Sequence, residues 1–396
     1  MNPTYARWHR WARKNVTAHQ LGRLSARAIA GVPWLGYRLG TATRSIPYSE
    51  AADVVHAEED YDEAFALDGP AAAFLDDYAG ELGPLWRDGV FHLVARLGVY
   101  GVRRGEILMG SGQLLRRSPR VLLDTESGTP NVEKQMPAIH RHRLRLAGPV
   151  LTLARTPRGS GHYYHFIAER FRFVLHALRT CPELRTATVV VRPEPNAYQK
   201  AAYDYLARTY PGLVIREVEA DVRVVCEELV CVGRRDVHRV SHFAGRADFE
   251  EIAHAYRTVY GIAPPARPTR RLYLSRAGIR LRRTENEAEI EAALAARGFE
   301  TVRPETLSHA DQVRLFGEAK TIVATGGAAL TNLLFAPAGA TVVETSPREI
   351  QFPFFIGLAL QMGQRYGHVY GGPPGPHELY RLDPKALAAT LDALGG

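Results

Sequence analysis

The sequence predicts an α/β protein whose C-terminal half contains a parallel sheet. In residues 270–347 short apolar strands alternate with helical segments. This alternation is typical of parallel strands joined by helical crossovers. Two of the strand-to-helix junctions carry distinctive residues, the first a group of arginines and the second a pair of glycines. Because ligands bind outside the carboxyl ends of such strands, we expect both junctions to contribute to one binding site.

The first junction follows a strand at residues 271–275 and precedes a helix that Thr284 or Asn286 can cap. Guanidinium groups donate forked hydrogen bonds to phosphate oxygens, and the bare N–H groups of a helix N-terminus attract the same anion. A solvated basic loop is the alternative explanation of these charges. We interpret the junction as a phosphate site. Its arginines are Arg276, Arg280, Arg282 and Arg283.

The second junction follows a buried strand at residues 322–324. Its two glycines lack the Cβ atoms that would block a close approach to the backbone, although many such turns carry glycine for packing alone. The next strand ends in Glu344, whose carboxylate can accept from a ribose hydroxyl or pair with an arginine. A nucleotide is therefore the expected ligand. The candidate binding residues of this turn are Gly326, Gly327, Ala328, Thr331 and Asn332.

Residues 270–347 resemble the C-terminal half of the family 61 glycosyltransferases. That family includes bacterial capsular-polysaccharide enzymes and eukaryotic xylosyl- and N-acetylglucosaminyltransferases. The specific part of the resemblance is the spacing from Ser275-Arg276 to Asn286-Glu287, and the run GAALTNLLF extends it.

A second, shorter match is GHYYHFIAERFRFVLHAL at residues 161–178. This run is similar to a family helix that contains Asn-Tyr-Tyr-His-Trp. The chain departs from the family pattern at four places. In the glycine turn, Gly326 stands where a histidine is usual and Ala329 replaces a second glycine. In the helix motif, Gly161 or His162 stands in place of the asparagine and Phe166 replaces the tryptophan.

The resemblance implies a GT-B fold, which has two Rossmann-like lobes with a cleft between them. It also implies inverting transfer from a nucleotide sugar to a glycan or glycolipid acceptor, without a required metal or other cofactor. It further implies that Arg276, Arg282, Arg283 and Asn286 lie near the donor, together with the glycine turn. Two alternatives are a polysaccharide pyruvyltransferase-like enzyme of the same fold and a catalytically silent scaffold.

The helix predicted within residues 161–178 carries the candidate catalytic residues. His162, His165 and Glu169 are three and four residues apart and therefore share one face. Inverting transfer needs a base for the acceptor hydroxyl proton, and a buried carboxylate or a neutral histidine suits that task. We predict Glu169 or His165 as this base. A packed helix face is the alternative, and a metal site is disfavoured because the His-Glu-x-x-His signature is absent.

An acidic motif, Asp60-Tyr61-Asp62, is similar to a metal and nucleotide motif of another glycosyltransferase fold. Here it lies in a long acidic segment in which no flanking buried strand is evident. We predict that it is a solvated charge run. The sequence therefore indicates no metal ligand.

Charge is segregated along the chain. The net charge is +8, and no acidic residue occurs before Glu50, whereas residues 1–49 carry many arginines and several tryptophans. This mixture suits an anionic membrane surface, and a disordered basic tail is the alternative. Nucleic acid is not the expected partner, because no recognised binding motif accompanies the charge. Three scattered cysteines and the lack of a long apolar run or signal pattern favour a cytoplasmic protein, or one peripheral on the inner membrane face.

Four segments are predicted. Residues 1–49 form a basic aromatic arm, residues 50–263 an acceptor-binding lobe, residues 264–380 a nucleotide-sugar-binding lobe, and residues 381–396 a C-terminal helix. The proline-rich stretch at 262–270 is the expected linker between the lobes. In the first lobe we expect strands at 90–101, 147–155, 187–193, 213–218 and 224–233, a hairpin at 106–115, and helices at 196–210 and 246–261.

Overall fold

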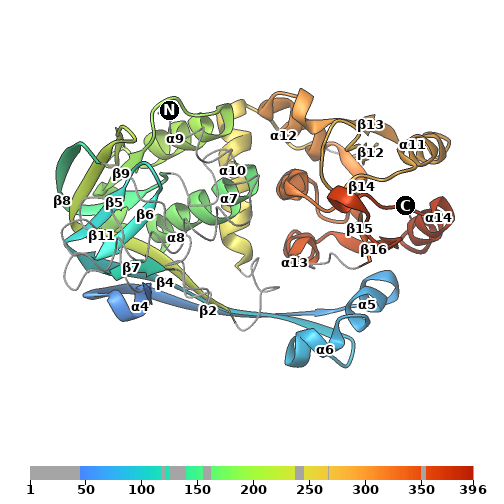
Figure 1. Cartoon of the computed structure of the whole chain (residues 1–396), viewed down its shortest axis with the longest axis horizontal. Coiled ribbons are helices and arrows are strands. Elements are labelled where there is room, and N and C mark those ends of the chain that lie inside the picture. The colour runs from blue at the N-terminus through green and yellow to red at the C-terminus, as the bar shows by residue number, and fades with distance from the viewer. Residues whose placement is uncertain are drawn as a thin grey trace.

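The computed structural model describes residues 45–116, 121–124, 140–154, 162–236, 245–265, 267–348 and 354–395. Two separate sheets and the helices that cover them make a mixed α/β protein, which confirms the predicted class (Figure 1). Most of the predicted basic aromatic arm, residues 1–44, lies outside the described residues. No helix in the described part of the chain is long and apolar enough to cross a membrane.

The C-terminal sheet has five parallel strands in the order β13-β12-β14-β15-β16. In chain order this is 2-1-3-4-5, so the direction of winding reverses between β12 and β14. Doubly wound sheets bind ligands at such a reversal. Both predicted junctions, after β12 and after β14, therefore lie at the switch point. The strands are β12 (Arg270–Leu274), β13 (Glu300–Val302), β14 (Ala319–Thr325), β15 (Thr341–Pro347) and β16 (Arg365–Gly371).

Helices cover this sheet on both faces (Figure 1). The short helix after the glycine turn is a 3-10 helix, η7. The predicted C-terminal helix packs on β16 and α11, so it completes the cover of the sheet. The helices are α11 (Glu287–Ala295), α12 (His309–Gly317), η7 (Ala328–Phe335), α13 (Phe354–Gln361) and α14 (Pro384–Ala393).

The N-terminal sheet has eleven strands and is mixed. The strands β8, β9, β10 and β11 run parallel to their neighbours in that group, and a hairpin at residues 105–116 is present as predicted. The expected strands at 90–101 and 224–233 are each part of one longer strand. The strands are β1 (Ser45–Pro47), β2 (Val54–Ala66), β3 (Trp86–Arg87), β4 (Val90–Arg103), β5 (Gly105–Leu108), β6 (Gln113–Arg116), β7 (Val121–Asp124), β8 (His142–Thr152), β9 (Thr188–Val191), β10 (Val214–Glu217) and β11 (Val222–Asp236).

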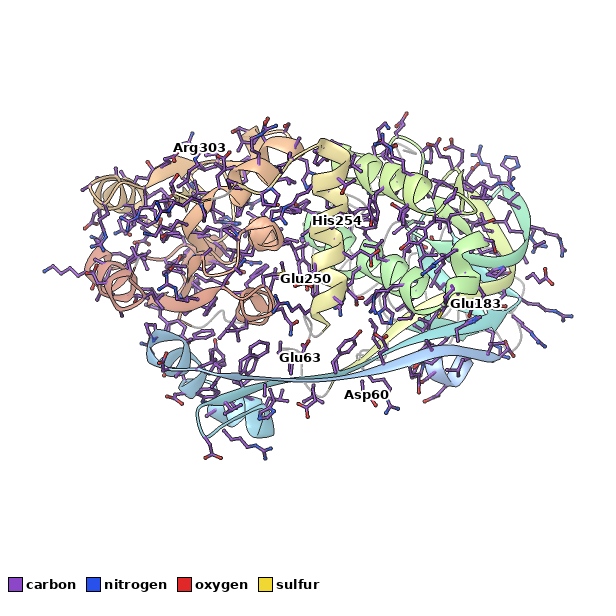
Figure 2. The ribbon with its side chains drawn as sticks, turned by 180° about the vertical axis from the view of Figure 1, so that it is seen from behind. Asp60, Glu63, Glu183, Glu250, His254 and Arg303 are labelled. Atoms are coloured by element: carbon purple, nitrogen blue, oxygen red, sulfur yellow. The ribbon has the colours of Figure 1, made fainter. Side chains whose placement is uncertain are left out.

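The acidic segment around Asp60 is a strand, so the expectation that it has no strand context is wrong. It forms β2, which pairs antiparallel with β4 over its whole length. The acidic side chains of Asp60 and Asp62 point to the exposed face, and Asp60 pairs with Arg96 at 2.6 Å. Figure 2 shows Asp60 on the outer side of this long two-stranded arm. The motif is thus a solvated charge run, as predicted.

The arm formed by β2 and β4 reaches the far edge of the C-terminal sheet (Figure 1). Its tip carries the helices α5 (Gly69–Asp76) and α6 (Ala79–Leu82). The helix α5 packs on the edge strand β16, where the ring of Phe74 stacks on His368 with 4.3 Å between centroids. The arm therefore joins the two sheets at a second place, distant from the helices between them.

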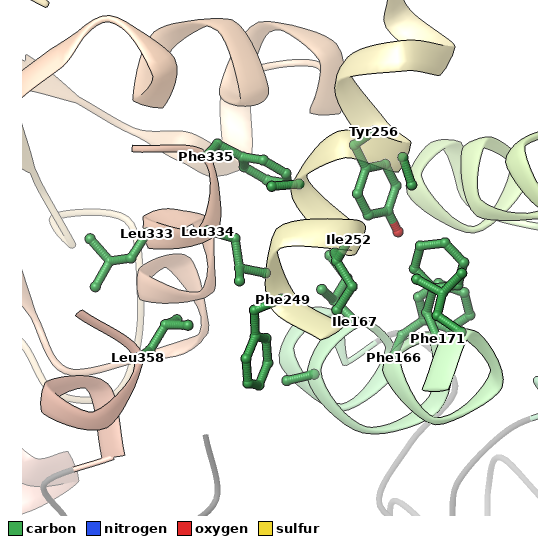
Figure 3. Packing of buried hydrophobic residues seen from close by; sticks show 14 of the residues in the cluster. Phe166, Ile167, Phe171, Phe249, Ile252, Tyr256, Leu333, Leu334, Phe335 and Leu358 are labelled. Atoms are coloured by element: carbon green, nitrogen blue, oxygen red, sulfur yellow. The ribbon is translucent and has the colours of Figure 1, made fainter. Parts of the chain in front are cut away.

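The main apolar core is continuous between the two sheets. The helix α10 (Arg246–Tyr260) lies at its centre, with Phe249 and Tyr256 fully buried. Figure 3 shows Phe166 and Phe171 on one side of α10 and Leu334 on the other. The remaining helices of the N-terminal part are α4 (Tyr48–Ala51), α7 (Tyr163–His165), a π-helix (Phe166–Phe171), α8 (Arg172–Thr180) and α9 (Ala197–Thr209).

Candidate functional site

One carboxylate, that of Glu287 at the start of α11, organises the arginine junction. Its Oε1 accepts hydrogen bonds from the hydroxyl groups of Ser275 at 2.7 Å and Tyr273 at 2.9 Å, and from the backbone N–H of Arg276 at 3.2 Å. Its Oε2 accepts from the hydroxyl of Thr284. The carboxylate therefore ties the end of β12 to the first turn of α11. This contact gives a physical reason for the spacing of the two residue pairs seen in the sequence.

Arg276 extends its guanidinium across the loop toward the glycine turn. Its Nε and Nη2 both donate to the carbonyl of Leu281, at 3.2 and 2.9 Å. Its Nη1 lies so close to Gly327 that a Cβ atom there would be 2.5 Å away. No described carboxylate forms an ion pair with it. Burial and, to a smaller extent, the charge of Arg282 lower the pKa of this guanidinium. The guanidinium therefore lacks the counter-ion that a partly buried charge favours.

Arg282 connects the two junctions. Its Nε donates to Glu378 at 2.9 Å, and its Nη1 donates to the carbonyl oxygen of Gly326 at 3.2 Å. Its backbone φ is 57°, in the left-handed region that non-glycine residues rarely adopt. Two of its donor nitrogens are thus already occupied by the protein, and its charge has an acidic partner.

The other two arginines lie at the surface. Arg280 is exposed and has His377 as a neighbour at 3.5 Å. Arg283 is exposed too, and its side chain has no ion-pair partner among the described residues. Both can reach an anion only from the solvent side of the loop. Of the four arginines, Arg276 alone combines partial burial with the absence of an acidic partner.

Asn286 is buried and its amide group is engaged by the protein. Its Nδ2 donates to the carbonyl of Leu382 and to Glu289, both at 2.8 Å, and its Oδ1 accepts from the backbone N–H of Leu382 at 3.0 Å. These contacts anchor the segment before α14 beside the arginine loop. The side chain predicted near the donor thus lies beside the arginine loop, but its polar atoms bind other groups of the protein.

Side chains approach both glycines of the turn closely. A Cβ atom on Gly326 would lie 2.6 Å from Oε1 of Glu344, and one on Gly327 would lie 2.5 Å from Nη1 of Arg276. A methyl group at either position would therefore require the neighbouring side chain to shift. The arginine loop and the glycine turn are therefore adjacent, as the order of the strands requires.

Glu344 is 4% exposed on β15 and belongs to a chain of polar groups. Its Oε2 accepts from the hydroxyl of Tyr366 at 2.9 Å, and that hydroxyl lies 3.1 Å from Nδ1 of His368. The Nε2 of His368 lies 2.8 Å from the hydroxyl of Ser346. Burial raises the pKa of Glu344 to about 8 and lowers the pKa of His368 to about 3. Both groups are therefore neutral over most of the physiological range.

The remaining residues of the turn point into the protein. Ala328 begins η7, and Thr331 is fully buried with a hydroxyl that has no hydrogen-bond partner. Asn332 donates from Nδ2 to Gln312 at 2.9 Å and accepts at Oδ1 from the hydroxyl of Tyr163. Because Tyr163 belongs to the second motif seen in the sequence, the two motifs are in direct contact.

The candidate base residues form a pair. Nδ1 of His165 lies 2.9 Å from Oε2 of Glu169, and both side chains are partly accessible. The ring of His162 lies 4.6 Å from that of His165. A single helix was predicted here, but a π-helix occupies residues 166–171 and interrupts the α-helix. Such π-turns are frequent at functional sites. The first turn of this helix packs on η7, the helix that follows the glycine turn.

Two organising residues, Glu287 and Tyr366, were not among the predicted site residues. For Glu287 the signal was present in the spacing, because a carboxylate twelve residues after a serine at a strand end can fold back on it. For Tyr366 there was none, since it lies on a different strand from Glu344. Among the residues with described positions, no three His, Cys, Asp or Glu side chains could hold a metal ion. Metal independence stays a prediction.

Comparison with known proteins gives one family. The model of the family described as Glycosyltransferase 61 matches residues 163–343. The match begins at Tyr163 and includes the His165–Glu169 pair, the arginine loop and the glycine turn. No curated protein matches the chain. The chain therefore belongs to the glycosyltransferase 61 family and is a glycosyltransferase.

Proposed function

We propose that this glycosyltransferase transfers a sugar, with inversion, from a nucleotide sugar bound at the switch point of the C-terminal sheet. The observation that supports this most directly is Arg276. Its guanidinium is partly buried, lacks an acidic partner among the described residues and lies against Gly327, between the two strands where the winding reverses. A diphosphate would supply the missing negative charge.

The arginine loop would stabilise the leaving group. As the bond between the anomeric carbon and the diphosphate breaks, its electron pair passes to the phosphate oxygen. Nη1 of Arg276 and backbone N–H groups at the start of η7 would interact with this developing charge. Arg282 would act mainly by holding the turn, because Glu378 and the Gly326 carbonyl already engage it.

The His165–Glu169 pair would accept the acceptor proton. The acceptor hydroxyl oxygen attacks the anomeric carbon from the side opposite the diphosphate, and its proton passes to Glu169 or to His165. The 2.9 Å contact lacks hydrogen-bond geometry, but it brings the two groups close enough for one to influence the charge of the other. Glu169→Gln should keep nucleotide affinity and lower turnover by ~10²–10⁴. His165→Ala should equal that loss if histidine is the base, and should be milder if it only orients the acid.

The finer assignments follow the family resemblance. We propose a GT-B arrangement in which residues 50–263 present the acceptor and residues 264–380 hold the donor. A glycan or glycolipid acceptor, as in capsular polysaccharide synthesis, would fit a cytoplasmic enzyme on the inner membrane face. The basic residues 1–44 would then supply contact with anionic lipid. Deletion of these residues should release the protein from anionic vesicles, and unchanged binding would refute this part.

A panel of nucleoside diphosphates in a thermal-unfolding assay tests the proposal first. A specific nucleotide at a hundredfold excess over its Kd should stabilise the fold by ~2.7 kcal/mol. The matching nucleotide sugar should then be consumed in the presence of acceptor glycans. Stabilisation without turnover would favour a silent scaffold, and turnover of phosphoenolpyruvate would favour a pyruvyltransferase. If no nucleotide stabilises the protein, the donor site is wrongly assigned.

A further inference from the structure

A chain of hydrogen bonds joins the N-terminal helices to the C-terminal sheet. Its centre is His309, the first residue of α12, whose Nε2 lies 2.9 Å from the hydroxyl of Tyr163 and whose Nδ1 lies 2.8 Å from the hydroxyl of Tyr260. Tyr163 donates to Oδ1 of Asn332, and Nδ2 of Asn332 donates to Gln312. The chain thus links α10, α12, α7 and η7.

Counting protons fixes the direction of every bond. Nε2 of Gln312 donates to the carbonyl of Pro304 at 2.9 Å, and a carbonyl can only accept. Oε1 of Gln312 is then the acceptor for Nδ2 of Asn332, and Oδ1 of Asn332 is the acceptor for the hydroxyl of Tyr163. Because that hydroxyl has used its one proton, it accepts from Nε2 of His309. The Nδ1 of a neutral His309 is left to accept from Tyr260. One tautomer of His309 therefore satisfies the whole chain.

The centre of this hydrogen-bond chain, His309 and Asn332, is buried among apolar groups, which limits the access of water to these two side chains. His309 is 6% exposed, and its ring lies 4.8 Å from that of Tyr256 and 6.0 Å from that of Phe335. Burial lowers the pKa of His309 to about 3, which keeps it in the neutral form that the chain requires. A buried polar group without its partner is costly, so the chain strongly favours one relative position of the elements it joins.

We propose that Tyr163, His309 and Asn332 are positioning residues for the transfer reaction, which fix the His165–Glu169 pair relative to the glycine turn. Tyr163 precedes His165 by two residues on the same helix, and Asn332 lies in the helix that begins directly after Gly327. Loss of their contact lets one segment move against the other. The inference rests on the proposed function, because it assumes that the proton acceptor lies on the Tyr163 side of this contact and the donor phosphate on the Asn332 side.

Tyr163→Phe tests the proposal, because it removes the hydroxyl and keeps the ring. Tyr198→Phe is a matched control. Its ring packs on that of Tyr163 at 5.2 Å, but its hydroxyl takes no part in the hydrogen-bond chain. Among the described residues, that hydroxyl has the exposed Asn196 as its hydrogen-bond partner, at 3.3 Å. We expect Tyr163→Phe to lower kcat by ~10–10²-fold with little change in KM for the donor, since small misplacements of reacting groups are costly. Tyr198→Phe should keep kcat within ~twofold of the original protein.

Two further measurements separate positioning from general damage. Amide hydrogen exchange over residues 163–171 should rise in Tyr163→Phe and not in Tyr198→Phe, while the binding of nucleoside diphosphate stays unchanged. In the Glu169→Gln background, Tyr163→Phe should cost much less than it does alone, because both changes impair the same step.

The outcome that overturns the proposal is equal behaviour of the two tyrosine variants in exchange and in turnover. Additive losses in the double variant would also overturn it, because Tyr163 would then act independently of the base. If no nucleotide sugar is turned over, the proposed function fails, and the exchange comparison still decides whether the chain fixes the helix.

Discussion

Replacement of Arg276 by alanine should separate nucleotide affinity from stability. Two of its three nitrogens already donate to the Leu281 carbonyl, so Nη1 is the donor left for a ligand. One charge-assisted hydrogen bond contributes ~1.5–3 kcal/mol, which corresponds to a loss of about tenfold to 150-fold in affinity. The free energy of unfolding without ligand should change by less than ~1 kcal/mol, because the lost bonds to Leu281 are offset by relief of burial and of repulsion from Arg282.

Calorimetric titration with the nucleoside diphosphate that stabilises the protein measures this loss directly. Arg280→Ala is the matched control, since Arg280 lies in the same loop but is exposed, and its affinity should fall by less than ~fivefold. Gly327→Ala should mimic Arg276→Ala, because a Cβ atom would lie 2.5 Å from Nη1. It should add little once Arg276 is gone. Unchanged affinity in Arg276→Ala with a large loss in Arg280→Ala would refute the reasoning and assign the phosphate to the outer side of the loop.

Three further predictions concern the glycine turn and the metal. Gly326→Ala should destabilise the fold by ~1–3 kcal/mol, because its Cβ would lie 2.6 Å from Glu344, and chemical denaturation should show a smaller cost in a Glu344→Ala background. The pKa of Glu344 is about 8 in the folded state, against 4.5 for an ordinary glutamate. Between these pH values the folded state keeps a proton that the unfolded state releases. The free energy of unfolding therefore falls as pH rises through this range. The free energy of unfolding of Glu344→Gln, relative to that of the original protein, should therefore rise from pH 5 to pH 8.5 by at most ~5 kcal/mol. Thermal unfolding at several pH values measures this, and a constant difference would contradict the shift. Turnover should survive chelation of divalent ions, and loss of activity with recovery on adding manganese would refute metal independence.

The C-terminal sheet was predictable because its signals are local. The strands β12, β14 and β15 are short apolar runs next to helices, and the arginines and glycines mark the junctions. The edge strand β16 is of mixed composition and was not predicted. The usual handedness of such crossovers determines only part of the strand order. That the two junctions are neighbours depends on the placement of β14 beside β12, which the structure provides.

The arm was not predictable, because its alternation is hidden by acids on both faces. Along β2, Asp60 and Asp62 face solvent, while Glu59 and Glu63 face inward. The inward acids are acceptable because distant residues pair with them, Arg179 with Glu59 at 3.1 Å and Gln361 with Glu63. A strand whose inner face is apolar shows an alternating sequence pattern and can be predicted. When the inner face carries acids that pair with residues distant in the sequence, the same pattern is lost and the segment resembles a charged linker.

The departure of the glycine turn from the family pattern also has a structural explanation. Gly326 stands where the family usually carries a histidine, which suggests a simple loss of a side chain near the donor. The space beside Gly326 is not empty, however, because the carboxyl group of Glu344 fills it, held by Tyr366. A histidine introduced at 326 alone would displace that carboxyl group, since even a Cβ atom would lie 2.6 Å from its Oε1. Residues 326 and 344 therefore constrain one another, and any comparison of donor binding between this chain and relatives that carry the histidine has to treat the two positions as a pair.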